Sequence, residues 1–377
     1  MENKKFIIIT TIPLSLYFFK GQIQVLKKSF EVNLVSSPGS MLDESCKAED
    51  VNGFPISMKR EISLFHDIFS LFSLIKLFFK IKPDVVHGST PKAGLLSMIA
   101  AWFCNVNTRI YYIHGLRYQG TKGLKRRILV TMERLSCFFS TDVYAVSFGV
   151  KDVLEQDRIT NKKINIIGNG SVNGINIDYF SVDNKEVVDL RKPLGLTTDN
   201  FVFGFVGRLV KDKGINELVT AFLQINKNHP ECRLLLVGGF EKGDPIDKNI
   251  ENEIKTNNKI LNVGFQKDVR PYYNLMDIFV FPSYREGFGV ALMEAAAMNV
   301  PSVSSNIIGC NEIISNGYNG VLVNPKSKDE LFTVMKMFIL DENKRNEMAK
   351  VCRDYVIKKY EQNNLWDKTL ESYTLIS

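Results

Sequence analysis

Short apolar runs alternate with segments of helical periodicity along most of the chain. The runs cover residues 6–11, 31–36, 84–86, 109–113, 142–147 and 164–167, and then residues 201–206, 233–237, 261–264, 278–281, 300–304 and 320–323. Short continuous apolar runs are typical of buried parallel strands, and the helices between them supply right-handed crossovers. The pattern therefore predicts an α/β fold built on parallel sheets.

The length of 377 residues predicts two domains, because one hydrophobic core rarely serves so long a chain. Residues 181–200 are polar and rich in Asp and Lys, as expected of a linker. We expect an N-terminal domain at residues 1–180, the linker at 181–200 and a C-terminal domain at 201–358. A last helix within residues 359–377 is expected to pack back on the N-terminal domain.

Residues 62–79 form the most apolar helix candidate, with large side chains on more than one face: Ile62, Phe65, Ile68, Phe69, Phe72, Ile75, Phe78 and Phe79. A transmembrane helix needs about 20 apolar residues, and His66, Asp67 and Lys76 interrupt this run. The segment therefore predicts a buried or membrane-skimming helix.

The N-terminus imitates a secretion signal, since Lys4 and Lys5 precede a long apolar run. Pro13 interrupts the run, and no small-residue cleavage site follows before Lys20 and Gly21. A first buried strand and a cytoplasmic protein are favoured.

The six cysteines include no Cys-x-x-Cys pair, so reduced thiols are expected rather than a zinc site.

Composition is that of a globular protein, with 45% hydrophobic and 24% charged residues and a net charge of +7. The positive charge belongs to the first 180 residues, which hold 23 Lys and Arg against 15 Asp and Glu. One basic segment contains Arg117, Lys122, Lys125, Arg126, Arg127 and Arg134. It is either a solvated helix face or a surface attracted to anionic phospholipid headgroups or a lipid-linked pyrophosphate. Nucleic acid is not expected as a partner, because no recognised motif accompanies the charge.

Polar residues follow several predicted strands, at the edge where open α/β sheets bind ligands. His87 ends one strand of the first half and His114 follows another. In the second half, Arg208 and Lys213 lie between a strand and a helix, and a fork of donors beside a point charge suits a diphosphate. The loop at residues 168–174 is Gly-rich but lacks the spacing of a dinucleotide fingerprint.

Glu286 and Glu294 stand eight residues apart in PSYREGFGVALMEAAAM, residues 282–298. Glycines let a backbone approach a ligand, and a helix starting near Val290 directs its first amides toward an anion. A carboxylate at Glu294 among alanines needs a partner, because a buried charge is costly unless paired. A ribose diol is one candidate partner and a structural ion pair is the other.

Five segments of the second half resemble glycosyltransferase family 4, a retaining family of GT-B fold: GRLVKDKG (207–214), LLLVGG (234–239), VGFQKDVRPYY (263–273), DIFVFPSYREGFGVALMEAAAMNVP (277–301) and GCNEIISNGYNGVLV (309–323). The first half is similar more loosely, through His87-Gly88, Lys92-Ala93-Gly94, His114-Gly115 and GNGSVNGINIDYF. The resemblance implies two Rossmann-like domains facing each other across a cleft. It extends to members that assemble capsule, O-antigen or N-glycan precursors on polyprenyl diphosphate.

The resemblance also implies residue roles. Arg208 and Lys213 would bind the diphosphate of a nucleotide sugar, beside Gly207. Glu286 would contact sugar hydroxyls with the backbone of residues 287–289, which are Gly287, Phe288 and Gly289. Glu294 would hold the ribose, and His114 would reach the donor sugar. The acceptor would meet His87, Lys92 and Ser15.

The implied reaction moves a hexose or HexNAc from a UDP-linked donor to a polyprenyl-diphosphate saccharide at the inner face of the cytoplasmic membrane. No Asp-x-Asp pair occurs, so no metal and no other cofactor is expected. Two departures stand out: the first strand is followed by Thr10-Thr11-Ile12-Pro13-Leu14 instead of a Gly-rich loop, and Asn299 replaces a common Gly. The alternatives are a UDP-N-acetylglucosamine 2-epimerase-like isomerase and an inactive sugar-nucleotide-binding subunit.

Overall fold

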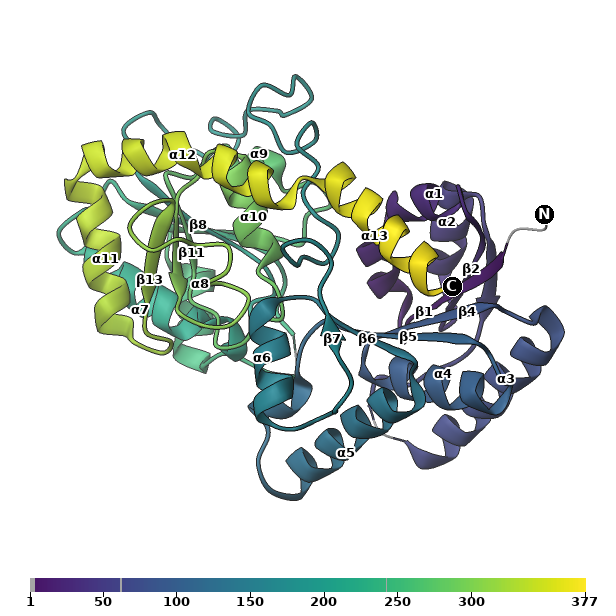
Figure 1. Cartoon of the computed structure of the whole chain (residues 1–377). Coiled ribbons are helices and arrows are strands. Elements are labelled where there is room, and N and C mark those ends of the chain that lie inside the picture. The colour runs from purple at the N-terminus through teal and green to yellow at the C-terminus, as the bar shows by residue number, and fades with distance from the viewer. Residues whose placement is uncertain (1–3, 62, 242) are drawn as a thin grey trace. The chain divides into compact units, whose positions relative to one another are not determined.

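The structure is a computed structural model that describes residues 4–61, 63–241 and 243–377 (Figure 1). It divides into two compact units, one made of Met1–Gly174 with Gln362–Ser377 and the other of Ile175–Glu361. Each unit contains one parallel β-sheet with helices on both faces. The expected pair of Rossmann-like α/β domains is therefore confirmed.

The sheet of the first unit has seven parallel strands in the order β3-β2-β1-β4-β5-β6-β7. Its strands are β1 (Lys4–Ile9), β2 (Phe30–Ser36), β3 (Asn52–Pro55), β4 (Val85–Ser89), β5 (Thr108–Ile113), β6 (Asp142–Ala145) and β7 (Ile164–Asn165). Its helices are the 3₁₀ helices η1 (Pro13–Phe19) and η2 (Arg117–Gly120), and α1 (Gln22–Leu26), α2 (Ser40–Glu49), α3 (Leu64–Ile81), α4 (Pro91–Phe103), α5 (Gly123–Phe139), α6 (Phe148–Gln156) and α13 (Gln362–Ile376).

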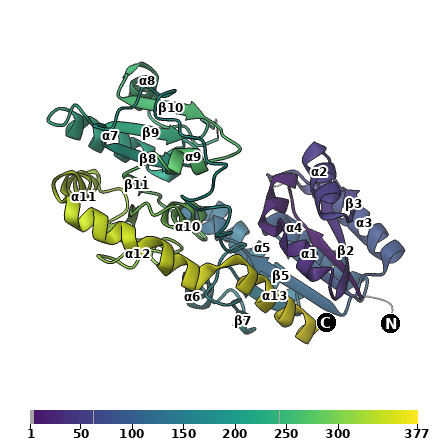
Figure 2. The ribbon, with the colours of Figure 1, turned by 90° about the horizontal axis from the view of Figure 1, so that it is seen from above.

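Two helical layers enclose this sheet. Helices α3, α4 and α5 pack side by side on one face, and α1, α2 and α13 lie on the other (Figure 1). Helix α13 runs beside α1 in both views (Figures 1 and 2). Its Tyr373 is buried and stacks on Phe6 of β1, with 5.7 Å between the ring centroids. The last helix of the chain therefore completes the core around the first strand.

The sheet of the second unit has six parallel strands in the order β10-β9-β8-β11-β12-β13. Its strands are β8 (Val202–Val206), β9 (Arg233–Val237), β10 (Ile260–Gly264), β11 (Ile278–Phe281), β12 (Ser302–Ser305) and β13 (Gly320–Val323). Its helices are η3 (Lys211–Lys213), α7 (Ile215–Asn226), α8 (Lys248–Thr256), α9 (Arg270–Tyr273), α10 (Val290–Ala297), α11 (Lys328–Leu340) and α12 (Glu342–Tyr360). Helix α7 contacts α8 and α11, while α10 contacts α12.

Residues 181–200, the predicted linker, belong to the second unit and contain no helix or strand. Arg270, at the start of α9, holds the residues that come directly before this linker. Its guanidinium lies 3.6 Å from the centroid of the Tyr179 ring and donates to the Tyr179 carbonyl oxygen. The segment therefore packs on the second unit although it lacks regular structure.

The first crossover of the first unit contains two short helices instead of one long helix. The helices η1 and α1 are separated at Gly21, whose φ is +77°. A Cβ there would lie 2.5 Å from the Trp366 ring, so the break lets α13 approach. Helix α2 and strand β3 were not predicted, because the Asn-Gly of β3 is typical of a turn.

Helix α3 matches the predicted apolar helix, but it is not buried. The large side chains Phe65, Phe69 and Phe72 point away from the sheet and are exposed, and only Ser70, Leu74 and Phe78 are buried. Ile62, which the prediction included, lies outside the described residues. In the part of the chain that the structure describes, no helix has both the length and the apolar character needed to cross a membrane.

Candidate functional site

The predicted donor residues gather where strands of the second sheet end. β8 ends at Val206 and is followed by the turn that carries Arg208 and Lys213. β11 pairs with β8 in parallel, ends at Phe281 and leads through residues 282–289 into α10. Because both strands end at the same edge of the sheet, their loops lie side by side.

Gly214 makes this close approach possible. Its φ is +70°, and a Cβ on it would lie 2.1 Å from the carbonyl oxygen of Pro282. Backbone contacts then join the two loops: the Tyr284 amide donates to the Asp212 carbonyl oxygen at 2.8 Å, and the Ser283 hydroxyl donates to the same oxygen at 3.3 Å. The glycine therefore brings the Lys213 turn against the loop that holds Glu286.

Lys213 and Glu286 form an ion pair at this edge, with Lys213 Nζ donating to Glu286 Oε1. The two side chains are only 15% and 13% exposed. Lys213 Nζ also lies 5.0 Å from the centroid of the Phe281 ring. A cation that is largely shielded from water interacts strongly with any anion that reaches it. The pair thus presents a positive and a negative group to one small region.

Arg208 lies on the same turn but is half-exposed and has a different partner. Its Nη1 donates to Glu241 Oε2 at 2.7 Å, and Glu241 follows β9. Glu241 was not among the predicted site residues. Both cations expected at a diphosphate are therefore paired with carboxylates in this structure, and an anionic ligand would have to replace those partners.

Glu294 lies on α10, and its carboxylate is held by Tyr273 of α9. The Tyr273 hydroxyl donates to Glu294 Oε2 at 2.9 Å and lies 3.2 Å from the Ala291 carbonyl oxygen. Burial raises the pKa of Glu294 to about 7, and the Tyr273 hydrogen bond acts in the opposite direction by favouring the ionised form. The expected carboxylate with a partner is present, and the partner is a tyrosine instead of a cation.

The glycines between the two glutamates are packed against a third loop. The Gly289 amide donates to the Gly309 carbonyl oxygen at 2.9 Å. Gly309 has a φ of +77°, and a Cβ on it would lie 2.8 Å from the Gly287 carbonyl group. Phe288 turns its ring into the core against Tyr360, at 5.4 Å between centroids, so only its backbone faces the loop region.

Gly207, which begins the turn after β8, is packed closely against Gly238. A Cβ on Gly238, which follows β9, would lie 1.8 Å from the Gly207 carbonyl oxygen. The loops after β8 and β9 are therefore as closely packed as those after β8 and β11. In the described residues of the chain, no group of three His, Cys, Asp or Glu side chains is gathered in the manner of a metal site.

In the first unit, His87 and His114 lie at the ends of β4 and β5 and share Ser89. Ser89 Oγ lies 3.3 Å from His87 Nδ1 and 3.2 Å from His114 Nε2. His87 Nε2 lies 3.0 Å from the Tyr373 hydroxyl, and the His87 side chain is fully buried. The structure thus gives His87 partners inside the core, and its acceptor contact stays a prediction.

The two ring nitrogens of His114 differ in their surroundings. Burial lowers the pKa of His114 to about 3, and burial together with the nearby His114 lowers the pKa of His87 to about 3. Both rings are therefore neutral at neutral pH. Among the described residues, no hydrogen-bond partner reaches His114 Nδ1. A neutral imidazole with a free nitrogen can exchange a hydrogen bond with a hydroxyl group.

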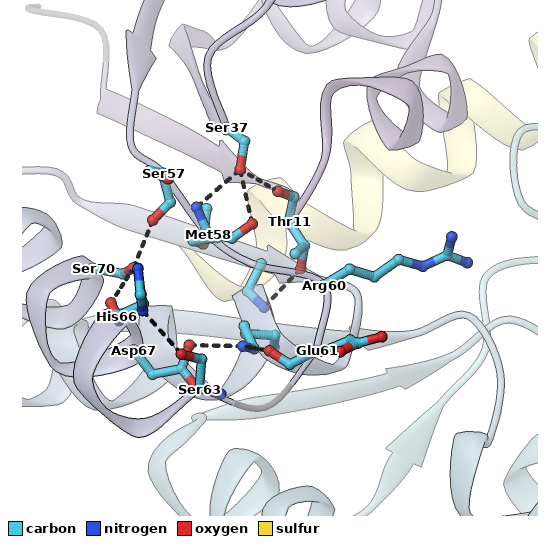
Figure 3. Close-up of polar contacts among 12 residues, drawn as sticks. Thr11, Ser37, Ser57, Met58, Arg60, Glu61, Ser63, His66, Asp67 and Ser70 are labelled. Carbon is cyan, nitrogen blue, oxygen red and sulfur yellow. Dashed lines mark hydrogen bonds and ion pairs between the residues drawn. The ribbon is translucent and has the colours of Figure 1, made fainter. Parts of the chain in front are cut away.

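Lys92, predicted to meet the acceptor, is buried at the start of α4. Its Nζ lies 2.7 Å from Asp67 Oδ1 and also donates to the Glu61 carbonyl oxygen. Figure 3 shows Asp67 and Glu61 beside Ser63 and His66 at the start of α3. An acceptor phosphate would therefore have to compete with Asp67 for Lys92.

The loop after β1 is hydrogen-bonded to the start of α4 through the side chain of Thr11. Thr11 Oγ1 lies 2.7 Å from Thr90 Oγ1 and accepts from the Ala93 amide at 3.2 Å. The Thr11 carbonyl oxygen in turn accepts from the Ser37 hydroxyl at 2.8 Å (Figure 3). Ser15, the remaining predicted acceptor residue, lies on η1 and its amide donates to the Ile12 carbonyl oxygen. The loop after β1 therefore has threonine hydroxyls where a Gly-rich loop would have free backbone amides.

Sequence reasoning missed Tyr273, Glu241 and Gly309 as parts of the site. No pattern in the sequence connects Tyr273 to Glu294 twenty-one positions later. Tyr273 and Gly309 did carry a signal, because each belongs to a motif in the resemblance. The contacts of all three depend on which loops meet at the sheet edge.

Two family models match the chain. "Glycosyl transferases group 1" covers residues 188–354 and "Glycosyltransferase Family 4" covers residues 24–171. The capsular polysaccharide biosynthesis glycosyltransferase CapM of Staphylococcus aureus is 35% identical over 99% of this chain and 97% of its own length. The UDP-Gal:alpha-D-GlcNAc-diphosphoundecaprenol alpha-1,3-galactosyltransferase of Escherichia coli is 27% identical over 92% of this chain and 89% of its own length.

A solved structure shares the fold. The crystal structure of Anabaena HepE in complex with UDP-glucose superposes with a TM-score of 0.82, at 19% identity, over 98% of this chain and 99% of that chain.

Proposed function

Because the chain belongs to the family 4 glycosyltransferases, we propose that it transfers a sugar from a UDP-linked donor to a polyprenyl-diphosphate-linked saccharide in surface polysaccharide biosynthesis. The observation that carries the proposal is the shielded Lys213–Glu286 pair at the edge of the second sheet. The E. coli relative, whose name specifies a UDP-sugar and a diphosphoundecaprenol acceptor, supports both substrate classes. The transferred group is a hexose or HexNAc, with retention of configuration.

In this proposal the two cations of the turn bind the donor diphosphate. Lys213 leaves Glu286, and Arg208 leaves Glu241, when the phosphates arrive. Charge grows on the leaving phosphate as the glycosidic bond breaks, and preorganised cations in a shielded site stabilise it. The freed Glu286 accepts hydrogen bonds from sugar hydroxyls. Because these two cations neutralise the charge of the diphosphate, we propose that the reaction needs neither a metal nor another cofactor.

Glu294 binds the ribose in this proposal. Tyr273 already occupies Oε2, so Oε1 is the atom offered to the diol. The role of His114 is contact with the donor sugar, and its neutral ring with a free Nδ1 has the chemistry for that contact. Lys92 would meet the acceptor diphosphate by exchanging Asp67 for it.

The protein is proposed to work in the cytoplasm at the inner face of the membrane. A polyprenyl carrier keeps its chain in the bilayer, so an enzyme that uses it must reach the headgroup layer. The cations of α5 support such a contact, since each cation near an anionic surface contributes about 1 kcal/mol. Family membership favours transfer over the isomerase alternative.

The decisive experiment is a screen of UDP-, GDP- and ADP-sugars against a mixture of polyprenyl-diphosphate saccharides. Transfer from a UDP-sugar, undiminished by EDTA and giving a product with the anomeric configuration of the donor, is the expected result. The variant Glu286→Gln should lose most of the activity, while Glu253→Gln on α8, away from the sheet edge, serves as a matched control. Transfer only from GDP- or ADP-sugars would refute the UDP assignment. An absence of transfer and of donor hydrolysis would favour the inactive binding subunit.

A further inference from the structure

Helix α3 presents its most apolar surface to the outside of the first unit. Phe65, Phe69 and Phe72 are 81%, 72% and 65% exposed. Leu64, Ile68 and Phe79 are exposed on the same side of the helix. A surface helix of a globular protein normally turns its apolar stripe toward the core. The outward apolar face of α3 therefore needs a partner outside the unit.

The inward face of α3 is held by polar contacts, so the outward orientation is a property of the packed helix. Asp67 accepts from Lys92 at 2.7 Å and from the Ser63 amide at 3.1 Å. The Ser70 hydroxyl donates to the Ser57 carbonyl oxygen at 2.6 Å (Figure 3). Rotating α3 to bury its phenylalanines would break all of these contacts.

The apolar surface continues across the neighbouring helices. Phe79 of α3 meets Phe103 of α4 with ring centroids 6.4 Å apart, and Trp102 of α4 meets Phe139 of α5 at 5.2 Å. Among the described residues, 24 large hydrophobic side chains are exposed, and half of them belong to this layer. These twelve, which we call the three-helix face, are Leu64, Phe65, Ile68, Phe69, Phe72, Phe79, Trp102, Phe103, Leu124, Ile128, Leu135 and Phe138.

Every exposed charge on these three helices is positive, in the part of each helix that the structure describes. The exposed charged residues are Lys76, Lys80, Lys125, Arg126, Arg127 and Arg134. The two acidic residues are withdrawn, since Asp67 pairs with Lys92 and the buried Glu133 accepts from the Tyr111 hydroxyl at 2.7 Å. Among these cations Arg126 has a carboxylate partner, Asp157, at 3.3 Å. Apolar side chains bordered by an excess of cations are the pattern of a surface that binds anionic lipid.

We propose that the three-helix face docks on an anionic phospholipid bilayer, with the aromatic rings of α3 entering the headgroup region and the cations of α3 and α5 meeting lipid phosphates. The proposal rests on the proposed function in taking the acceptor to be lipid-linked. Asp67 is on the first turn of α3 and binds Lys92, so this face begins beside the residue proposed to meet the acceptor diphosphate.

A second copy of the chain fits this face less well. Two-fold self-association places the same surface on both sides of the interface. The cations of α3 and α5 would then oppose their own copies, and the face offers no exposed carboxylate among its described residues to offset them. A bilayer that contains anionic lipid matches both the apolar area and the charge.

The test compares the full chain with the variant Phe65→Gln/Phe69→Gln/Phe72→Gln in co-sedimentation with phosphatidylcholine vesicles that contain or lack phosphatidylglycerol. The triple variant should lower the partition coefficient on the anionic vesicles at least about 10-fold, because three large apolar groups no longer enter the lipid. The matched control is Val188→Gln/Leu340→Gln/Leu375→Gln, which removes three exposed apolar side chains outside the three-helix face and should bind as the wild type does.

Two results would overturn the proposal. One is equal binding of the triple variant and the wild type. The other is that light scattering shows the wild type to be a dimer and the triple variant to be a monomer, while the two bind vesicles equally. Transfer to a water-soluble, short-chain diphosphate acceptor separates this proposal from the proposed function. The triple variant should keep the wild-type rate on that acceptor, whereas a wild type with no transferase activity would refute the function and leave the vesicle result standing.

Discussion

Donor affinity should depend on pH through Glu294. Burial raises the pKa of this carboxyl group to about 7, so at neutral pH about half of the unliganded protein carries a proton there. The proposed ribose contact favours the ionised form, which accepts two hydroxyl hydrogen bonds. Lowering the pH protonates Glu294 before the donor can bind. The apparent Km for the donor should therefore rise as the pH falls through about 7.

The size of the effect follows from the pKa. If only the ionised form binds, the Km at pH 5.5 should exceed that at pH 8 by about 30-fold, one factor of ten for each pH unit below the pKa. The variant Glu294→Gln should abolish this dependence. At pH 8 it should raise the Km by roughly 10- to 150-fold, the equivalent of one charge-assisted hydrogen bond of about 1.5–3 kcal/mol.

The assay measures the Km of a UDP-sugar at several pH values from released UDP, with saturating acceptor. The diphosphate of a nucleotide sugar is esterified at both ends and does not titrate in this range. Tyr273→Phe provides a matched control. The Tyr273 hydrogen bond favours the ionised carboxylate of Glu294, so losing it should raise the pKa and move the midpoint of the Km profile to higher pH. A wild-type Km that stays constant between pH 5.5 and 8, or a Glu294→Gln variant with the wild-type profile, would refute the ribose assignment.

Three further predictions concern other parts of the chain. Arg208→Ala should slow transfer by roughly 10- to 150-fold in kcat/KM through a lost contact of about 1.5–3 kcal/mol, and an unchanged rate would remove Arg208 from the site. Neutralising residues 125–127 should weaken co-sedimentation with anionic vesicles and reduce its sensitivity to salt, and equal sedimentation would return these cations to an ordinary solvated surface. Gly214→Ala, whose Cβ would lie 2.1 Å from the Pro282 carbonyl oxygen, should lower the free energy of unfolding by about 2–5 kcal/mol in urea titrations. Gly264→Ala has a similar φ and no atom within 4 Å of the added Cβ, so its loss should be about 1 kcal/mol, and equal losses would contradict the close-approach argument.

Most of the strands could be predicted because buried parallel strands are continuous apolar runs. Residues 201–206 and 278–281 were expected as strands and became β8 and β11. The exposed edge strand β3 could not be recognised in this way, because its Asn-Gly-Phe-Pro sequence is held by pairing with β2. Hydrophobicity alone also could not reveal which side of α3 faces outward. That orientation is set by the polar contacts of Asp67 and Ser70.

The candidate site was predictable where its residues lie in one segment at a strand end. Glu286 and the Gly-rich start of α10 lie in one segment, and their placement at a strand end followed from the sheet. The partners of Glu294 and Arg208 come from separate crossovers, α9 and the loop after β9. Such contacts depend on the three-dimensional approach of loops, which single-sequence periodicity does not encode.

The place of α13 has a consequence for the order in which the protein is made. A ribosome synthesises residues 175–361 before the helix that packs against β1. Until Tyr373 emerges, Phe6 and His87 lack the ring that covers them. The second unit, which is contiguous in the chain, can therefore fold first, while the core of the first unit stays open until residues 362–377 are made.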